Sequence, residues 1–92
     1  MSEPSLAHRR GRARFRAWRR GFREADLLLG GFADANLEAM DEADLVRFEA
    51  LLDQPDYDIY AWVVGTRSPP AAFDHDLMAR LRAFRPDPGA AT

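Results

Sequence analysis

Apolar residues recur at helical spacing in five short stretches of this chain, and glycine or proline lies between most neighbouring stretches. Spacings of three and four residues place side chains on one face of an α-helix, whereas a half-buried strand requires alternation. No apolar run approaches the roughly 18 residues that a membrane span needs. The apolar faces must therefore be buried against one another. The pattern predicts an all-α protein, a compact five-helix bundle that forms a single domain.

The first stretch ends at a glycine that is surrounded by charge. Phe15, Trp18 and Phe22 follow at i, i+3 and i+7, and we expect this stripe to face the core. Gly21 interrupts the helical run. A glycine between two amphipathic stretches is typical of the helix C′ position, where positive φ costs a residue without Cβ little. The sequence therefore predicts a helix–helix corner at Gly21, with a positive φ.

The second stretch is expected over residues 22–37, with Leu28 and Phe32 on one face. Two adjacent glycines, Gly30 and Gly31, lie inside this stretch. Glycine in a helix interior is less favourable than alanine by about 1 kcal/mol. We therefore expect a kink or a local break at this pair rather than a straight helix.

The remaining three stretches have recognisable starts and stops. Asp41 is the expected N-cap of the third helix, which Pro55 ends, and Gly65 closes the fourth. A linker with two prolines at 69 and 70 precedes the fifth. The expected core positions are Leu45, Phe48, Leu51 and Leu52 in the third helix, Ile59, Trp62 and Val63 in the fourth, and Phe73, Leu77, Leu81 and Phe84 in the fifth.

These stretches divide the chain into three parts. Residues 1–7 are polar and are predicted to be a flexible N-terminus. Residues 8–85 are predicted to form the five-helix domain. Residues 86–92 are rich in proline, glycine and alanine and are predicted to be a disordered tail.

The net charge of −2 conceals a strong asymmetry along the chain. Residues 1–23 carry eight arginines and one acid, whereas residues 24–66 carry eleven acids and one arginine. A basic helix on an acidic body would make a dipolar molecule suited to docking on a partner of mixed charge. A small basic-helix nucleic-acid-binding protein is the alternative. Because the acidic block would repel a phosphate backbone, we expect no specific nucleic-acid partner.

The sequence lacks the residue sets that catalysis and metal binding require. Cysteine is absent, which removes thiolate nucleophiles and thiolate metal sites and agrees with a reducing compartment. His8 and His75 are the only histidines and show no metal-ligand spacing, so we interpret both as surface or capping residues. We therefore expect a protein that is not an enzyme, holds no metal and binds no cofactor tightly.

The corner around Gly21 combines residues that an ordinary helix would not choose. Arg19, Arg20, Arg23 and Glu24 surround the glycine, and an apolar run resumes at residue 27. A carboxylate is favoured in the first turn of the following helix by the exposed N–H groups and the helix dipole. The cluster is either a solvated corner, with an ion pair worth at most about 1 kcal/mol, or a binding surface. The spacing alone favours the solvated corner.

Residues 20–24, Arg-Gly-Phe-Arg-Glu, match the RGxxE motif of the succinate dehydrogenase assembly factor family, the small flavinator proteins of bacteria and mitochondria. The chain resembles that family well beyond this pentapeptide. The acidic helix start at 41–44, a helix with Phe48, Leu51 and Leu52, and the run Pro-Asp-x-Asp-Ile-Tyr-x-Trp over 55–62 follow in the family's order. The resemblance covers roughly residues 8–84, and the glycine pair at 30–31 is its least typical feature.

The resemblance implies a compact five-helix assembly chaperone. Such a protein promotes covalent attachment of FAD to the flavoprotein subunit of succinate dehydrogenase, and in some bacteria of fumarate reductase, so FAD belongs to the partner. We expect a monomer without membrane insertion, in the cytoplasm of a bacterium or in the mitochondrial matrix of a eukaryote. Some relatives are described as antitoxins, which keeps an antitoxin-like regulator as an alternative.

The motif residues are the candidate partner-binding site. Arg20, Gly21 and Glu24 carry the motif, and Arg23 and Asp26 are neighbours with weaker claims. On the resemblance, Arg20 would bind a partner carboxylate or carbonyl groups. Glu24 would orient that guanidinium or accept hydrogen bonds from the partner. Gly21 would let the partner backbone approach closely.

Overall fold

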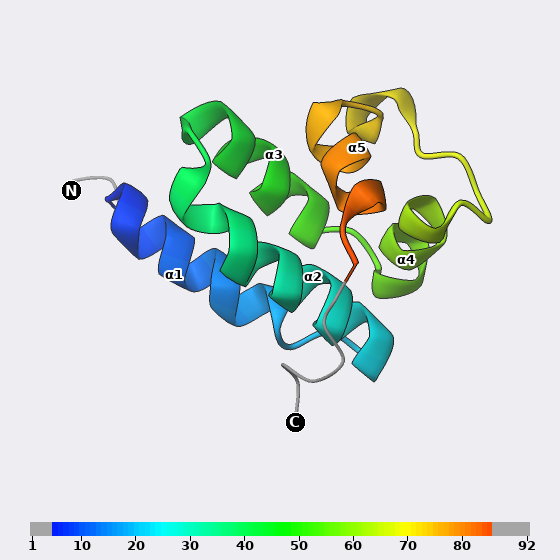
Figure 1. Ribbon diagram of the computed structural model, residues 1–92, viewed down its shortest axis with the longest axis horizontal. Helices are drawn as coiled ribbons and strands as arrows, with labels where there is room; N and C mark the ends of the chain where they lie inside the picture. Colours follow the sequence, from blue (N-terminus) through cyan, green and yellow to red (C-terminus); the bar gives the residue numbers. More distant parts are fainter. Residues whose placement is uncertain (1–4, 86–92) are drawn as a thin grey trace.

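The computed structural model describes residues 5–85, which form five α-helices and no strand (Figure 1). Two short 3₁₀ turns, η1 at Leu37–Ala39 and η2 at Ala71–Phe73, precede α3 and α5. The predicted all-α fold of five helices is confirmed for this part of the chain, and none of its helices is long and apolar enough to cross a membrane. The helices are α1 Leu6–Ala17, α2 Arg23–Asn36, α3 Glu42–Leu52, α4 Asp56–Val64 and α5 Asp76–Ala83.

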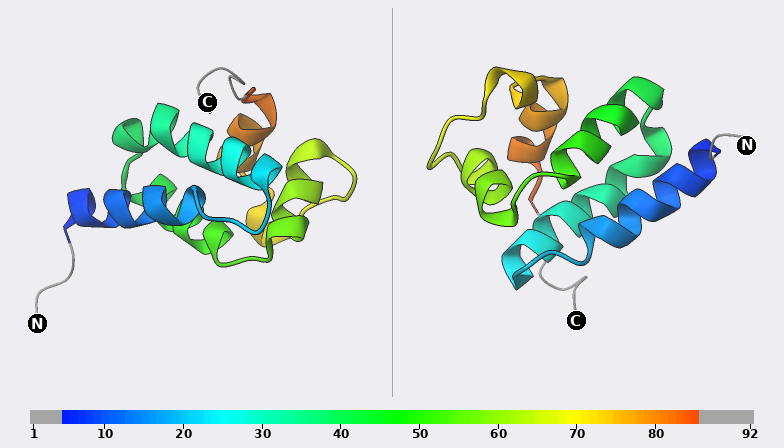
Figure 2. Two further views of the ribbon diagram at one scale, coloured as in Figure 1. Left: turned by 90° about the horizontal axis from the view of Figure 1, so that it is seen from below. Right: turned by 180° about the vertical axis from the view of Figure 1, so that it is seen from behind.

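The helices form two groups that pack end to end. α1, α2 and α3 lie side by side, with α2 running back along α1 and α1 also in contact with α3 (Figures 1 and 2). α4 and α5 pack against each other, and they reach the first group through α2 and α3 respectively. The α1–α2 connection consequently comes close to the connection between α3 and α4, where the candidate site lies.

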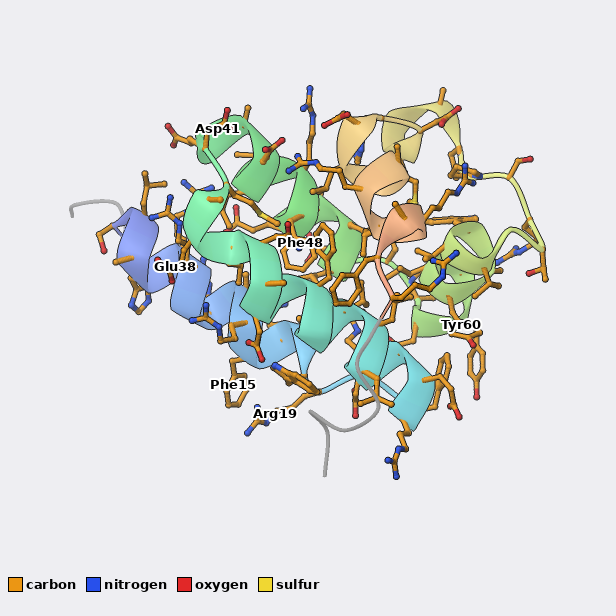
Figure 3. All side chains as sticks on the ribbon, in the orientation of Figure 1. Phe15, Arg19, Glu38, Asp41, Phe48 and Tyr60 are labelled. Carbon is orange, nitrogen blue, oxygen red and sulfur yellow. The ribbon has the colours of Figure 1, made fainter. Side chains whose placement is uncertain are left out.

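The core occupies the space where the two groups meet. Phe48 of α3 lies at its centre, and the ring of Phe32 on α2 faces it with 6.0 Å between centroids (Figure 3). Phe84 packs edge-on against Phe32 from the end of α5, at 5.7 Å. The core positions expected in the third and fourth helices are all buried. Fully buried side chains also include Leu29, Leu37, Met40, Leu45, Leu51, Ile59, Leu77, Met78 and Leu81.

The fifth helix is shorter than its expected apolar stripe. Phe73 lies in η2, where it is partly buried and stacks on Trp62 with 5.4 Å between centroids. His75 lies two residues after this turn and caps α5, because its Nδ1 accepts a hydrogen bond from the backbone N–H of Met78 at 3.2 Å. The interpretation of His75 as a capping residue is confirmed.

Other expected helix boundaries agree with the structure to within a few residues. Asp41 caps α3 by accepting from the backbone N–H of residue 44 at 2.8 Å, and Gly65 closes α4 with a φ of 92°. α3 ends at Leu52, and Pro55 precedes α4 as its N-cap. Ser5 caps α1, so that helix begins before the domain boundary expected at residue 8. Most of the predicted flexible N-terminus and the whole predicted tail at 86–92 lie outside the described residues.

The expected apolar stripe from Phe15 to Phe22 is not part of the core. α1 ends at Ala17, so Phe22 lies beyond the helix and cannot share its face. Phe15 is 58% exposed, and the guanidinium of Arg19 lies 3.7 Å from its ring centroid on the outside of the molecule (Figure 3). The prediction was wrong because it counted helical periodicity across the end of the helix. The only fully buried residues of α1 are Ala13 and Ala17.

Arginine side chains, rather than a broad apolar face, attach α1 to α2 and α3. Arg10 donates to the backbone carbonyls of Leu37 and Met40, at 3.1 and 2.8 Å. The pKa of Arg9 is raised, first because its guanidinium donates a hydrogen bond to Glu49. The ion pairs across this contact join Arg9 to Glu42 (3.2 Å) and Glu49 (2.6 Å), Arg14 to Asp34 (3.1 Å) and Glu38 (3.4 Å), and Arg16 to Asp53 (2.6 Å).

The glycine pair at 30–31 does not break α2, which is continuous from Arg23 to Asn36. A Cβ placed on Gly30 would lie 2.2 Å from Cδ2 of Trp18, so the indole ring rests directly on the backbone of α2. The indole Nε1 donates to Asp34 at 3.2 Å, which fixes the ring there. The expected local break was wrong, because α2 continues through the pair, and the glycine at residue 30 serves to admit the ring.

Candidate functional site

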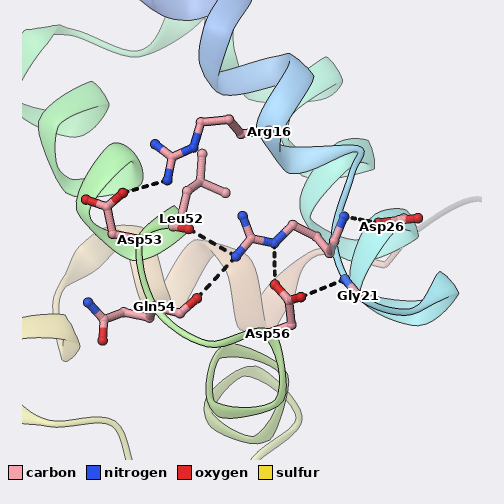
Figure 4. Close-up of polar contacts among 8 residues, drawn as sticks. Arg16, Gly21, Asp26, Leu52, Asp53, Gln54 and Asp56 are labelled. Carbon is pink, nitrogen blue, oxygen red and sulfur yellow. Dashed lines mark hydrogen bonds and ion pairs between the residues drawn. The ribbon is translucent and has the colours of Figure 1, made fainter.

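The Arg20 side chain points into the protein rather than toward solvent, with an exposed fraction of 9%. Its Nε donates to Oδ1 of Asp56 at 2.5 Å, at the start of α4 (Figure 4). Its Nη2 donates to the backbone carbonyls of Leu52 at 3.0 Å and Gln54 at 3.2 Å. These carbonyls belong to the end of α3 and the turn after it. Arg20 therefore ties the α1–α2 connection to the α3–α4 connection.

Asp56 uses its second oxygen to hold the backbone of the same corner. The N–H of Gly21 donates to Oδ2 of Asp56 at 2.6 Å (Figure 4). A Cβ on Gly21 would lie 2.8 Å from that oxygen, closer than real Cβ atoms come. The φ of Gly21 is not positive, so the expected C′ conformation was wrong. Glycine is needed at this position because a carboxylate oxygen occupies the space that a side chain would fill.

Asp26 completes the corner from within α2. Its Oδ1 accepts a hydrogen bond from the backbone N–H of Arg20 at 2.5 Å. This contact folds the α1–α2 connection back onto the first turn of α2. Asp26 and Asp56 thus hold the two consecutive backbone N–H groups of Arg20 and Gly21.

Sequence reasoning missed Asp56 as a member of this site. The residue was visible in the run at 55–62, but an acid at a helix start has an ordinary explanation in the exposed N–H groups and the helix dipole. Glu24 was expected either to orient the Arg20 guanidinium or to accept hydrogen bonds from the partner, and the structure gives the first of these roles to Asp56. The two partners lie 36 residues apart, and sequence spacing carries no signal for such a contact.

Arg23 and Glu24, the other polar residues of the motif, face solvent on the first turn of α2. Neither side chain makes a hydrogen bond or an ion pair with another residue in the range 5–85. The guanidinium of Arg23 and the carboxylate of Glu24 are therefore available to another molecule. The charged residues of the motif therefore differ in role. Arg20 forms hydrogen bonds within the protein, whereas Arg23 and Glu24 face solvent.

An aromatic cluster adjoins the exposed part of the motif. Phe22 stacks on Tyr57 with 4.6 Å between centroids and an interplanar angle of 12°. The ring of Tyr60 meets Phe22 edge-on at 5.3 Å. Tyr57 is 73% exposed, which is unusual for so large a ring and gives this end of the molecule an apolar surface.

Across residues 5–85, no group of three or more histidine, aspartate or glutamate side chains lies close enough to hold a metal ion. The charged groups that face solvent, together with the stacked rings, resemble the mixed polar and aromatic composition of protein–protein contact surfaces.

Comparison with known proteins identifies the family. Residues 11–85 match the family described as Sdh5, flavinator of succinate dehydrogenase. The chain is 42% identical over 65 residues to the FAD assembly factor SdhE of Acetobacter pasteurianus, covering 71% of this chain and 60% of that protein. It is 35% identical over 83 residues to succinate dehydrogenase assembly factor 2, mitochondrial, of Aedes aegypti, covering 88% and 51% respectively.

A third relative is succinate dehydrogenase assembly factor 2, mitochondrial, of Cryptococcus neoformans, which is 44% identical over 62 residues, or 67% of this chain and 35% of that protein. The matches thus span between about a third and three fifths of the relatives' own length. The family match includes the whole corner, from Arg20 to Asp56, together with all five helices except the start of α1. On this match, and as its sequence motif predicts, the chain belongs to the Sdh5 family of succinate dehydrogenase flavinators.

Proposed function

We propose that this protein is an assembly factor that promotes covalent attachment of FAD to the flavoprotein subunit of succinate dehydrogenase. The observation that carries the proposal is the family match over residues 11–85, which contains the complete RGxxE corner. The names of the relatives agree with it, since they describe an FAD assembly factor and succinate dehydrogenase assembly factors. Fumarate reductase is a further candidate for the flavoprotein served.

In this proposal the reacting groups belong to the partner, and the protein is not an enzyme. FAD and the residue that receives it lie on the flavoprotein subunit, and this chain binds no cofactor tightly. Holding two reacting groups in the right geometry is worth up to roughly 7–11 kcal/mol in well-oriented reactions. A helper that binds the reactive arrangement of the flavoprotein more tightly than other arrangements raises its population. Such a helper needs no nucleophile of its own.

The candidate contact residues divide into two roles. Arg23 and Glu24 would contact the flavoprotein directly, since their side chains face solvent. Arg20 and Asp26 would act indirectly by fixing the corner, because their polar groups are already hydrogen-bonded within the protein. The exposed backbone of Gly21 would allow close approach of the partner chain.

The test is a flavinylation assay with purified components. Flavoprotein subunit without covalent flavin is incubated with FAD, with and without this protein, and covalent flavin is read as fluorescence on a denaturing gel. We expect the protein to raise both the rate and the final yield. Equal yields with and without it would contradict the proposal.

In the same assay, a matched pair of arginine variants tests whether the corner is where the flavoprotein binds. Arg12 and Arg23 are both exposed, and neither side chain has a hydrogen-bond or ion-pair partner among residues 5–85. Arg23→Ala should lower the flavinylation rate, whereas Arg12→Ala, on α1 and outside the corner, should leave it unchanged. Equal effects of the two variants would show that general positive charge, and not the corner, matters.

A further inference from the structure

A pocket of about 400 Å³ opens between α2, α4 and the end of α5. Its size lies at the lower end of the range for specific binding pockets, which is about 300–1,000 Å³. The residues that line it are Glu24, Leu27, Leu28, Tyr60, Val63, Val64, Arg82, Phe84 and Arg85. The wall is chiefly apolar, and its charged members are one acid from α2 and two arginines from the end of α5.

The pocket adjoins the motif corner. Glu24 belongs to both, as the last residue of the motif and as part of the pocket wall. Tyr60 lines the pocket and its ring meets Phe22 edge-on at 5.3 Å, and Phe22 in turn stacks on the exposed ring of Tyr57. A partner that covers the corner would therefore also reach the pocket.

The two arginines of the pocket differ from most arginines of this chain because no carboxylate offsets their charge. Seven other arginines form ion pairs. Among residues 5–85, Arg82 and Arg85 bind only backbone carbonyls. Arg82 donates its Nε to Trp62 at 3.0 Å, and Arg85 donates its Nη1 to Arg82 and Phe84 at 2.6 and 3.0 Å. A carbonyl is neutral, so both guanidinium groups keep their positive charge.

The open charge of the pocket is therefore positive, and it lies on the α5 side. Glu24 is the only acid in the wall, and it forms no ion pair with either arginine. Two cations and one anion leave a net charge of +1. Nη1 and Nη2 of Arg82, and Nε and Nη2 of Arg85, have no hydrogen-bond partner among residues 5–85. A carboxylate is the side-chain group that such nitrogens bind most strongly.

We propose that the pocket receives a surface segment of the flavoprotein subunit that carries one large apolar side chain beside an aspartate or glutamate. The apolar side chain would be buried against Leu27 and Val64, and the carboxylate would pair with Arg82 and Arg85 on the α5 side. A segment with a lysine or arginine in place of the acid would meet two like charges there, which disfavours it. The identity of the partner rests on the proposed function, whereas the chemistry of the segment follows from the pocket.

A series of charges at residue 85 tests the sign of the partner's charge. Arg85 is exposed, follows the end of α5 and binds only carbonyls close to it in sequence, so the fold should tolerate its replacement. In titration calorimetry with the purified flavoprotein subunit, affinity should fall in the order Arg85→Lys, Arg85→Gln, Arg85→Glu. Arg85→Gln should weaken binding about fivefold and reduce its dependence on salt, because one exposed ion pair is lost. Arg12→Gln, which removes an exposed charge outside the pocket, should bind like the unmodified protein.

Two exposed valines test the apolar part of the pocket. Val64 lines the pocket and is 50% exposed, whereas Val46 on α3 is 51% exposed and lies outside it. Val64→Asp puts a carboxylate on the apolar wall, where it must be desolvated and repels the acid of the partner, so it should weaken binding about tenfold or more. Val46→Asp adds the same charge elsewhere and should bind like the unmodified protein. Thermal midpoints are recorded by circular dichroism, and if Val64→Asp lowers its midpoint, the series at residue 85 alone decides.

The outcomes separate the pocket from the proposed function. If the unmodified protein raises covalent flavin on the subunit but the three variants at residue 85 bind it equally tightly, or in the reverse order, the pocket proposal is wrong and the function stands. If the unmodified protein neither binds the subunit nor raises its covalent flavin, the proposed function is wrong, and the pocket assignment falls with it.

Discussion

Two arginines of the motif, three positions apart, have opposite surroundings. Arg20 is 9% exposed and donates three hydrogen bonds to Asp56 and to two carbonyls. Arg23 is exposed, with no side-chain partner among residues 5–85. Removing a buried donor leaves its acceptors unsatisfied. Removing an exposed side chain leaves no such group, because water can bind whatever it contacted. The same residue type therefore stabilises the fold at one position and remains available for binding at the other.

The first prediction follows from this difference. Arg20→Ala should lower the free energy of unfolding by about 2–3 kcal/mol, because Asp56 and two carbonyls lose their donor. Arg23→Ala should change it by less than about 0.5 kcal/mol. Arg20→Lys should restore little, since an ammonium group cannot reproduce the planar fork of donors. Urea unfolding of the three variants checks this, and equal stability of Arg20→Ala and Arg23→Ala would contradict it.

The second prediction concerns Gly21 and Asp56, whose contact leaves no room for a Cβ. Gly21→Ala should destabilise the protein by about 1–2 kcal/mol, because the carboxylate must move away from the N–H of residue 21. In an Asp56→Ala background the same change should cost much less, since the oxygen it meets is gone. A double-mutant cycle measures this coupling. Additive effects would show that Gly21 is needed for another reason.

At the scale of the helices, α1 is attached by a few specific contacts. It buries only two alanines, and arginine hydrogen bonds and the Trp18 ring beyond its end add to its contact with the rest of the fold. The ring lies where a Cβ of Gly30 would be. This close approach fixes how α1 sits along α2. It also positions the α1–α2 connection, and with it the motif corner.

The third prediction compares two glycines that lie inside helices. A Cβ on Gly11 in α1 would meet nothing within 4 Å, whereas a Cβ on Gly30 in α2 would lie 2.2 Å from Trp18. Gly11→Ala should stabilise the protein by up to about 1 kcal/mol through helix propensity alone. Gly30→Ala should destabilise it by about 1–3 kcal/mol despite the same propensity gain, because the indole is displaced. Thermal unfolding followed by circular dichroism distinguishes the two, and stabilisation by both would exclude close packing of the ring on α2.

The helices were predictable where the signal is local. Asp41, Gly65 and the apolar stripes of the third and fourth helices lie as the sequence predicts, because capping and periodicity depend on near neighbours. The packing role of Gly30 and the contact between Arg20 and Asp56 were not predictable. Both depend on residues from other elements, and neither leaves a periodic pattern.

For the molecule as a whole, the uneven charge of the sequence is largely balanced in the fold. Of the eight arginines in residues 1–23, four pair with carboxylates of α2, α3, α4 or the turn after α3, and Arg10 binds carbonyls. The basic helix expected to act as a docking surface instead uses much of its charge in ion pairs with other parts of the same chain. The remaining open groups include Arg23 and Glu24, which lie on the first turn of α2.

The fourth prediction is that nucleic acid binds only weakly and without sequence specificity. Arginines engaged by Glu49, Asp34 and Asp53 cannot neutralise phosphates without breaking their own ion pairs. We expect dissociation constants for duplex DNA and RNA weaker than about 1 μM at an ionic strength of about 0.15 M. Fluorescence anisotropy with labelled duplexes measures this.

A variant that frees an arginine tests the reason for that weakness. Glu49→Gln removes the carboxylate that Arg9 contacts at 2.6 Å, so a guanidinium becomes available to phosphate. The variant should bind duplex DNA more tightly than the unmodified protein, and the difference should shrink as salt is raised, because it reflects counterion release. Asp74→Asn also removes one negative charge but frees no arginine, since Asp74 has no ion pair within residues 5–85. Equal gains in affinity for the two variants would mean that net charge controls binding. A submicromolar complex of the unmodified protein with duplex DNA or RNA that persists when salt is doubled would favour nucleic acid as a partner.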